Sequence, residues 1–282
     1  MAVLTRYCSF GNTQERRRIT TNTARRRSVS QLKSYAQCGE SYRLSRVQQV
    51  MRRPAAWTLQ GNAVHAALEA YEKSWRQLSE VELIEIFEDE WSRLLGEAIA
   101  AHPDLDTWLQ PGRKKVENDL DDRHAESIEQ IRRYLSYVQT DPLKPWVLPD
   151  TGEPASEVEF FADFDGIPVY GFIDLILMDP RTGALHIRDI KTGSKRPAGA
   201  IQLGIYRHAV RLTLGIDPLW GDYWMGKDGA PLPPVDLTRY NYAWVARELR
   251  QMDESERAGR YLANPGDHCR VCDVAHHCLV MS

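Results

Sequence analysis

The chain has 282 residues, of which 43% are hydrophobic and 27% are charged, and its formal net charge is −3. That length suffices for one large domain with a sizeable core, or for two modest domains. No apolar run approaches the roughly 20 residues that a membrane span needs, and the N-terminus lacks the apolar core of a secretory signal. These features exclude a membrane partner and predict a cytoplasmic protein.

The charge is distributed unevenly along the chain. Residues 1–28 carry seven arginines against one acid, Glu15, so this arm has a net charge of +6 and the remainder −9. A basic, Thr-rich arm with few large apolar residues is predicted to be disordered when alone. It can be interpreted as a solvated tail, as an Arg-rich transit peptide or as a segment that contacts phosphates.

The pattern after the arm predicts a helical region over residues 29–150. Ser28 or Ser30 can cap the first helix, which begins in the stretch VSQLKSYAQCGESYRL. Further helices are expected from strong helix formers and from apolar residues at spacings of three and four. They cover about residues 61–74, 79–102 and 115–139.

Four prolines and a glycine in DPLKPWVLPDTGEP end this helical pattern, and strands follow. Alternating and continuous apolar runs between Ser156 and Lys191, separated by the turns DFDG and DPRTG, predict an antiparallel meander. A helix (AIQLGIYRHAVRLTLG), two short strands and a closing helix complete residues 151–262, before a Cys-containing segment at 263–282. The expected architecture is mixed α/β or α+β, with the helical region laid on a mixed sheet.

Asp174 interrupts the apolar run VYGFIDLILM, which predicts a central buried strand. A carboxylate inside such a strand requires a structural or functional explanation. A hairpin at DPRTG places Asp174 opposite residues 188–190, beside Asp189. Two buried carboxylates repel each other unless one is protonated or a cation lies between them. Lys191 shares the face of Asp189, so the set is predicted to hold Mg²⁺ or Mn²⁺ and to activate a water molecule. The alternative is that all three are ordinary hairpin residues.

Other polar residues support a functional site beside Asp174 and Asp189. Gln202 and Tyr206 fall at positions i and i+4 on one helix face just after the DIKTG turn, where they can contact a substrate next to the metal. His65 lies early in an apolar helix. It is either a histidine satisfied within the core or a further metal ligand.

Taken in order, GNAVH, GFIDL, RDIKTG and QLGIY resemble the motifs of the PD-(D/E)xK nuclease superfamily. The resemblance is to its RecB-like branch, which includes the CRISPR-associated RecB-like exonucleases and the AddB nuclease domain, and it covers roughly residue 30 to the C-terminus. It implies a restriction-endonuclease-like sheet, with residues 151–262 as the nuclease core. The implied metal ligands are His65, Asp174, Asp189 and the carbonyl of Ile190, with Lys191 as the catalytic lysine and Gln202 and Tyr206 as supports for DNA or the site.

An acid on the preceding strand also matches the family pattern. Either Glu157 or Glu159, in SEVEF, occupies that position, and the sequence does not distinguish them. The role expected of this acid is indirect at most.

The cysteines form a second constellation. Their odd number, five, argues against a disulfide framework. The same nuclease branch carries an iron–sulfur cluster held by one cysteine before the nuclease motifs and a C-x2-C-x5-C trio after them. The resemblance therefore implies a structural 4Fe–4S cluster on Cys38, Cys269, Cys272 and Cys278. Zn²⁺ is the alternative, with His268, His276 and His277 nearby, and Cys8 has no assigned role.

The function implied by the resemblance is that of a metal-dependent DNA exonuclease acting at single-stranded ends. No GxxxxGK[ST] phosphate loop is present, so the chain has no ATP-driven motor of its own. A separate helicase or recombination protein is a compatible partner, and so is a second copy of the chain. The alternatives are an endonuclease, a trimming enzyme for CRISPR spacer capture, a non-catalytic DNA-end-binding protein and a structural zinc protein.

Overall fold

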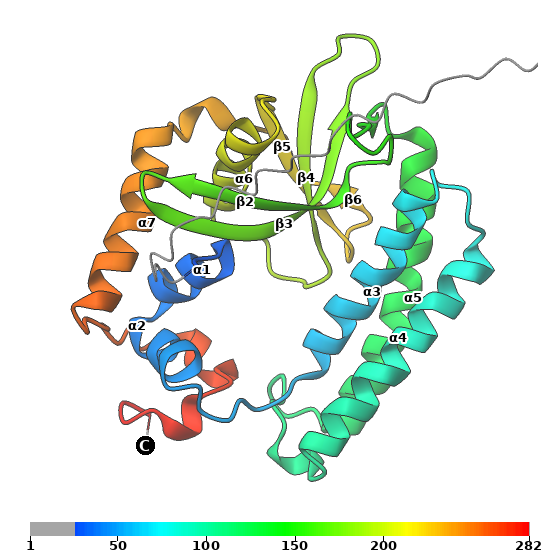
Figure 1. The fold of residues 1–282 in the computed structure, drawn as a ribbon. Helices are drawn as coiled ribbons and strands as arrows, with labels where there is room; N and C mark the ends of the chain where they lie inside the picture. The colour runs from blue at the N-terminus through cyan, green and yellow to red at the C-terminus, as the bar shows by residue number, and fades with distance from the viewer. Residues whose placement is uncertain (1–25, 282) are drawn as a thin grey trace, which may run out of the picture.

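The computed structural model describes residues 26–281 (Figure 1). The described chain begins with α1 (Val29–Gln37) and α2 (Gly39–Tyr42), which continues into a π-helical turn, Arg43–Val47. Long helices then pack against one another on one side of the molecule (Figure 1). These are α3 (Ala56–Lys73), α4 (Glu80–Ala101) and α5 (Val116–Thr140). Within residues 26–281, no helix combines the length and the apolar character that crossing a membrane requires.

The described residues also form a seven-stranded mixed sheet. Its strands are β1 (Lys144–Pro145), β2 (Ser156–Phe164), β3 (Ile167–Met178), β4 (Leu185–Lys191), β5 (Trp220–Met225), β6 (Ala230–Pro231) and β7 (Val235–Asp236). The predicted meander is confirmed, because β3 pairs antiparallel with both β2 and β4. The β4 strand pairs in parallel with β5, and α6 (Ile201–Thr213) lies in the crossover between them.

The last long helix is α7 (Tyr242–Arg257), and short 3₁₀ turns occur at Leu105–Thr107, Leu237–Arg239, Asp267–Val271 and Ala275–His277. Helices therefore cover a central mixed sheet, and the predicted mixed α/β class is confirmed.

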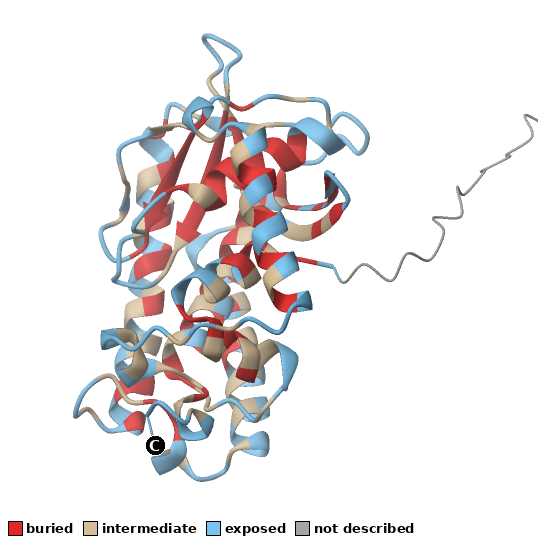
Figure 2. Ribbon diagram, turned by 90° about the vertical axis from the view of Figure 1, so that its left-hand side faces the viewer, coloured by how far each residue is buried: buried red, intermediate tan, exposed pale blue. Residues whose placement is uncertain are grey.

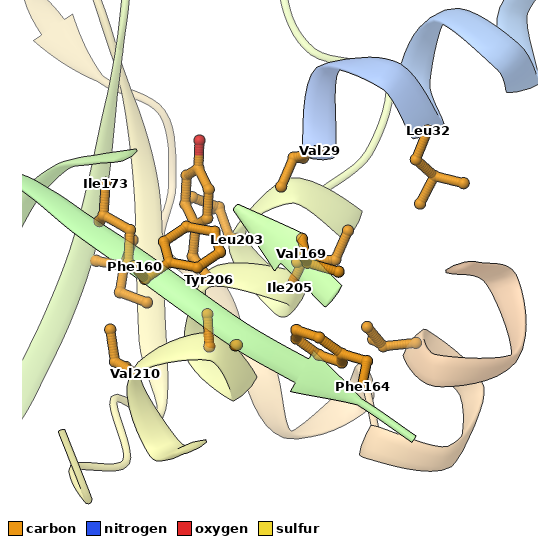
Figure 3. Close-up of a cluster of buried hydrophobic side chains, with 14 of the residues drawn as sticks. Val29, Leu32, Phe160, Phe164, Val169, Ile173, Leu203, Ile205, Tyr206 and Val210 are labelled. Carbon is orange, nitrogen blue, oxygen red and sulfur yellow. The ribbon is translucent and has the colours of Figure 1, made fainter. Parts of the chain in front are cut away.

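Two apolar cores hold these layers together, and Figure 2 shows the buried residues concentrated on the strands and on the inward sides of the helices. The first core joins the sheet to α1, α6 and α7, as Phe160, Leu203 and Val29 illustrate (Figure 3). The second joins the sheet to α3, α4 and α5. The β3 strand contributes Ile173 to the first core and Leu175 to the second. Since residues two apart on a regular strand share a face, β3 must twist sharply around the residue between them.

The predicted helix boundaries hold with two departures. The helix expected from residue 61 begins at Ala56, because Ala56 and Leu59 are buried in the second core and extend the helix by tertiary packing. The first helix ends at Gln37, because Cys38 has an extended backbone (φ −162°, ψ 110°) and α2 restarts after it. Its N-terminus is as predicted, with Ser28 as the cap.

The predicted disordered arm of residues 1–28 lies mostly outside the described residues, as does Cys8. Its described end differs from the prediction, because Arg27 is only 2% exposed. The guanidinium contacts carboxylates of Asp253 and Glu256 on α7, each at 2.5 Å. Its backbone N–H donates a hydrogen bond to the carbonyl of Pro168 on β3, and its carbonyl accepts one from the N–H of Tyr170, both at 2.8 Å. The charge of a buried arginine needs carboxylate partners of this kind. Arg27 is therefore part of the packed structure and not of a disordered arm.

A second buried arginine lies in the middle of the sheet. Arg188 on β4 is 1% exposed, and it donates two hydrogen bonds of 2.8 Å to Asp222 on β5 and one of 2.5 Å to Asp141. Burial alone would raise the pKa of Asp222, but the hydrogen bonds and charges of Arg188 and His186 together outweigh burial and lower that pKa below its ordinary value. The charged form of Asp222 therefore stabilises the fold.

We expect Asp222→Asn to lower the free energy of unfolding by about 3 kcal/mol near neutral pH, because it breaks a buried ion pair. The lowered pKa means that the contribution of Asp222 is fully present above about pH 4, the unfolded value, and is lost as the pH falls below it. Urea unfolding at pH 6 and below pH 4 should show the gap between wild type and variant narrowing. An equal gap at both pH values, or a loss equal to that of the exposed control Asp121→Asn, would contradict this account.

Candidate metal centre and active site

The candidate site lies just beyond the end of the hydrogen-bonded pairing between β3 and β4, at a gap between the two strands that we call the β3–β4 opening. Regular pairing of the two strands ends at Leu175 and Arg188. One residue further on, the carboxylate of Asp174 accepts a hydrogen bond of 2.6 Å from the backbone N–H of Ile190. The side chain thus replaces the strand partner that β4 would otherwise have there, and it places Asp174 next to Asp189, as the hairpin register predicts.

The carbonyl of Ile190 is directed to the same opening. Successive residues of a strand direct their backbone groups to opposite neighbours. The carbonyl of Lys191 accepts from Gly226, just past β5, at 2.8 Å. The backbone groups of Ile190 therefore point to the β3 side, where its N–H already meets Asp174. This orientation leaves the carbonyl facing the carboxylates, as a metal ligand there would require.

An imidazole and two carboxylates converge at this opening. Nδ1 of His65 on α3 lies 3.8 Å from a carboxylate oxygen of Glu157 and 3.8 Å from one of Asp174. The three ligand-capable atoms lie within 4.8 Å of one another. Nitrogen and carboxylate oxygen at these separations can move onto a single divalent ion with small side-chain rotations. His65 is therefore a residue of the site and not of the core interior.

Glu157 reaches this position through a strained backbone. Its φ angle is +49° at the second residue of β2, and this backbone region costs a non-glycine residue about 1–3 kcal/mol. The strand pairs on either side of it stay in register with β3, but Glu157 itself is left out of the ladder. Glu159 remains regularly paired with Phe172 and is exposed. The structure therefore distinguishes the two acids, and Glu157 is the one brought to the site.

Asp189 is the most enclosed carboxylate of the set, at 1% exposure. Its Oδ1 accepts a hydrogen bond of 2.7 Å from the side-chain amide of Gln202, and its Oδ2 forms an ion pair with Lys191. Burial raises the pKa of Asp189 to about 6, with a further contribution from Asp174, while Lys191 acts in the opposite direction. The protein alone therefore compensates this carboxylate incompletely.

The charges of the neighbouring Asp174 and His65 are also incompletely balanced by the protein. Burial also raises the pKa of Asp174, against the opposing charge of His65. Burial lowers the pKa of His65, but Asp174 and Glu157 outweigh it and raise that pKa to about 9. The site thus retains a proton on its histidine to balance crowded carboxylates. A divalent cation can supply the same compensation.

The residues predicted on α6 face the acids. The amide of Gln202 donates to Asp189 and, at 2.8 Å, to the hydroxyl of Tyr206, which packs edge-on against Phe160 with ring centroids 5.9 Å apart. Lys33 on α1 also contacts this amide, with its Nζ 3.0 Å from Oε1 of Gln202. The sequence pattern had not identified Lys33, because a single lysine on a polar helix face carries no local signal.

The four predicted cysteines are also brought together. Cys38, Cys269, Cys272 and Cys278 line one small cavity between α2 and the C-terminal segment, and all four are free thiols. The backbone N–H of Ser41 lies 3.5 Å from the sulfur of Cys38, and its hydroxyl lies 3.5 Å from that of Cys272. The sulfur of Cys269 accepts from the N–H of Gly266 at 3.4 Å. Four sulfurs around one cavity can ligate a metal ion or an iron–sulfur cluster.

The chain is similar in sequence to proteins of two mycobacteriophages. The chain is 35% identical over 264 residues to the Gene 69 protein of Mycobacterium phage D29, covering 90% of this chain and 96% of the relative. It is 33% identical over 281 residues to the Gene 69 protein of Mycobacterium phage L5, with the same two coverages. A solved structure titled "Crystal structure of SSO0001" matches 79% of this chain and 85% of that one, at 14% identity and a TM-score of 0.32.

The family model that matches the chain is described as the PD-(D/E)XK nuclease superfamily, and it covers residues 26–279. That span contains the β3–β4 opening, the acids, Lys191 and the four clustered cysteines. The chain therefore belongs to the PD-(D/E)XK nuclease superfamily.

Proposed function

We propose that the chain is a metal-dependent DNA exonuclease that hydrolyses phosphodiester bonds at single-stranded ends. The observation that carries this proposal is the convergence of a histidine, three carboxylates and a lysine at the β3–β4 opening of a nuclease-superfamily fold. The proposed ligands of Mg²⁺ or Mn²⁺ are His65, Glu157, Asp174, Asp189 and the carbonyl of Ile190. Oxygen donors dominate this set, as hard divalent cations prefer.

Each protein group has a role that follows from its contacts. A divalent ion in the site would lower the pKa of a bound water and polarise a phosphoryl oxygen. Lys191 is held by Asp189 through an ion pair, and ligation of that carboxylate would free the ammonium to orient the attacking water or to stabilise negative charge on the phosphate. Gln202, fixed between Asp189 and Tyr206, keeps the carboxylate oriented.

The finer assignment to the RecB-like branch rests on the ordered motifs GNAVH, GFIDL, RDIKTG and QLGIY. Their histidine, acids, lysine and glutamine lie in one site. Within that branch, DNA ends and a helicase or recombination partner are the proposed context. An endonuclease, including one for CRISPR spacer capture, differs by cutting circular DNA. A non-catalytic end-binding protein differs by leaving linear DNA intact.

We propose a structural 4Fe–4S cluster on Cys38, Cys269, Cys272 and Cys278. With Zn–S bonds of about 2.3 Å, the sulfurs of a zinc site lie about 3.8 Å apart. Among the described residues, the only three ligand-capable groups gathered within 4.8 Å are those of the His65 site, so no three cysteine sulfurs are that close. The wider spacing supports a cluster over Zn²⁺, and four cysteines match the ligand set of a 4Fe–4S cluster.

We expect Asp189→Asn and Lys191→Ala to reduce cleavage of linear single-stranded DNA by about 100-fold or more, because the first removes a proposed metal ligand and the second removes the ammonium proposed to act on the reacting phosphate. Glu157→Gln should also reduce it, whereas its matched control on the same strand, Glu159→Gln, should remain within about twofold of wild type. Rates are measured with Mg²⁺ and with Mn²⁺ on protein of unchanged circular dichroism. Near wild-type rates for both Asp189→Asn and Lys191→Ala would reject the proposal.

Protein purified without oxygen should be coloured and contain about four irons and about four sulfides per chain, as thiolate ligation of a 4Fe–4S cluster requires. Cys272→Ser should lose most of this iron, while Cys8→Ser should retain it because Cys8 is outside the proposed ligand set. Iron, zinc and sulfide analysis provides the measurement. A colourless wild-type protein with one zinc would overturn the cluster and leave the nuclease proposal standing.

A further inference from the structure

Lys33 is a second ammonium group at the proposed active site. Its Nζ donates to Oε1 of Gln202 at 3.0 Å, and the amide of the same Gln202 donates to Asp189 at 2.7 Å. Lys191 also reaches Oε1 of Gln202, at 3.4 Å. Two lysines from distant parts of the chain therefore converge on one amide oxygen beside the buried carboxylate.

The two lysines differ in how their charges are compensated. Lys191 forms an ion pair with Asp189. Lys33 forms no ion pair with any carboxylate of residues 26–281. Although Lys33 as a whole is exposed, burial of its ammonium lowers the pKa, and the charge of Lys191 lowers it further. The charge of Asp189 raises the pKa of Lys33 only through space, so an anion in direct contact with Lys33 would add an ion pair that residues 26–281 do not supply.

The position of Lys33 is fixed by the anchoring of α1 at both ends. Its first turn is capped by Ser28 and follows the buried Arg27, and Val29 and Leu32 are buried in the first core. Its C-terminal cap is Cys38, one of the clustered cysteines. A short helix held in this way restricts the reach of Lys33 to the region around Gln202.

There is space for a polymer next to this lysine. A cavity of about 480 Å³ begins at the following residue, Ser34, and its walls include Gln37 on α1 and Trp57 and Thr58 on α3. The two helices face each other below the β2–β3 hairpin (Figure 1). The α3 helix carries His65 two turns further on. Most of the remaining lining comes from α2, from residues 52–55 and from the C-terminal segment, so the cavity runs from α1 and the start of α3 toward the clustered cysteines.

We propose that Lys33 binds a non-bridging oxygen of the phosphate adjacent to the scissile phosphate. This inference rests on the proposed function, because the anion is then the backbone of a DNA strand. Lys191 acts on the reacting phosphate, and Lys33 holds the next one, with the strand continuing along the cavity between α1 and α3. A lysine ammonium recognises phosphate as a point charge.

The test measures binding of a fluorescently labelled single-stranded oligonucleotide in EDTA, where cleavage cannot interfere, over a series of NaCl concentrations. Lys33→Met keeps the apolar stem and removes the charge. It should weaken binding about tenfold and reduce the slope of log Kd against log salt by about 0.7, the value for one phosphate contact on a single strand. Lys33→Arg should restore most of both. The control Lys115→Met, an exposed lysine immediately before α5, should stay within about twofold.

Steady-state kinetics separate this role from simple support of Gln202. Phosphate binding predicts that Lys33→Met raises KM. An unchanged salt slope, or a fall in kcat at constant KM, would overturn the proposal. Failure of the wild type to bind DNA would overturn it as well. Wild-type binding without hydrolysis would instead contradict the nuclease function alone, since the binding test of Lys33 needs no cleavage.

Discussion

The hydrogen bond from the N–H of Ile190 to the carboxylate of Asp174 is the contact on which the site depends. It ends the β3–β4 ladder without leaving a buried N–H unpaired, which would cost about 1–3 kcal/mol. By occupying the place of a strand partner, Asp174 is held beside Asp189, and the Ile190 carbonyl is left facing both acids. The sharp twist of β3 and the positive φ of Glu157 occur at the same level of the sheet. These backbone features of the strands together form the β3–β4 opening.

Charge compensation links this opening to the rest of the chain. The carboxylates are balanced by His65 from α3, by Lys191 from β4 and indirectly by Lys33 from α1. The α1 helix begins beside a buried arginine and ends at Cys38. A cluster on the cysteines would thus fix one end of the helix that brings Lys33 to the site. Under this proposal the cysteines would influence catalysis only through the placement of α1 and would take no part in the chemistry.

The sequence allowed prediction of the parts of the site that depend on local patterns. The turn DPRTG and the apolar strands beside it determine the register of Asp174 against Asp189, and helical spacing places Gln202 with Tyr206. Glu157 and Glu159 share a face by alternation, so only the distorted backbone of Glu157 separates them. Arg27 resembles its neighbouring arginines in the sequence. Its partners on α7 lie 226 and 229 residues away, and Lys33 is 169 residues from Gln202, so no local pattern reveals these contacts.

We infer that the β3–β4 opening binds a divalent cation. Calorimetric titration of Mn²⁺ into protein that is freed of divalent ions but retains the proposed iron–sulfur cluster addresses this inference, because it requires neither a DNA substrate nor turnover. Binding to the wild type with affinity at least about tenfold higher than to Asp174→Asn is the predicted result, since that substitution removes a charged oxygen ligand while retaining the side-chain shape. Equal binding to the two proteins, or no binding to the wild type, would contradict the account.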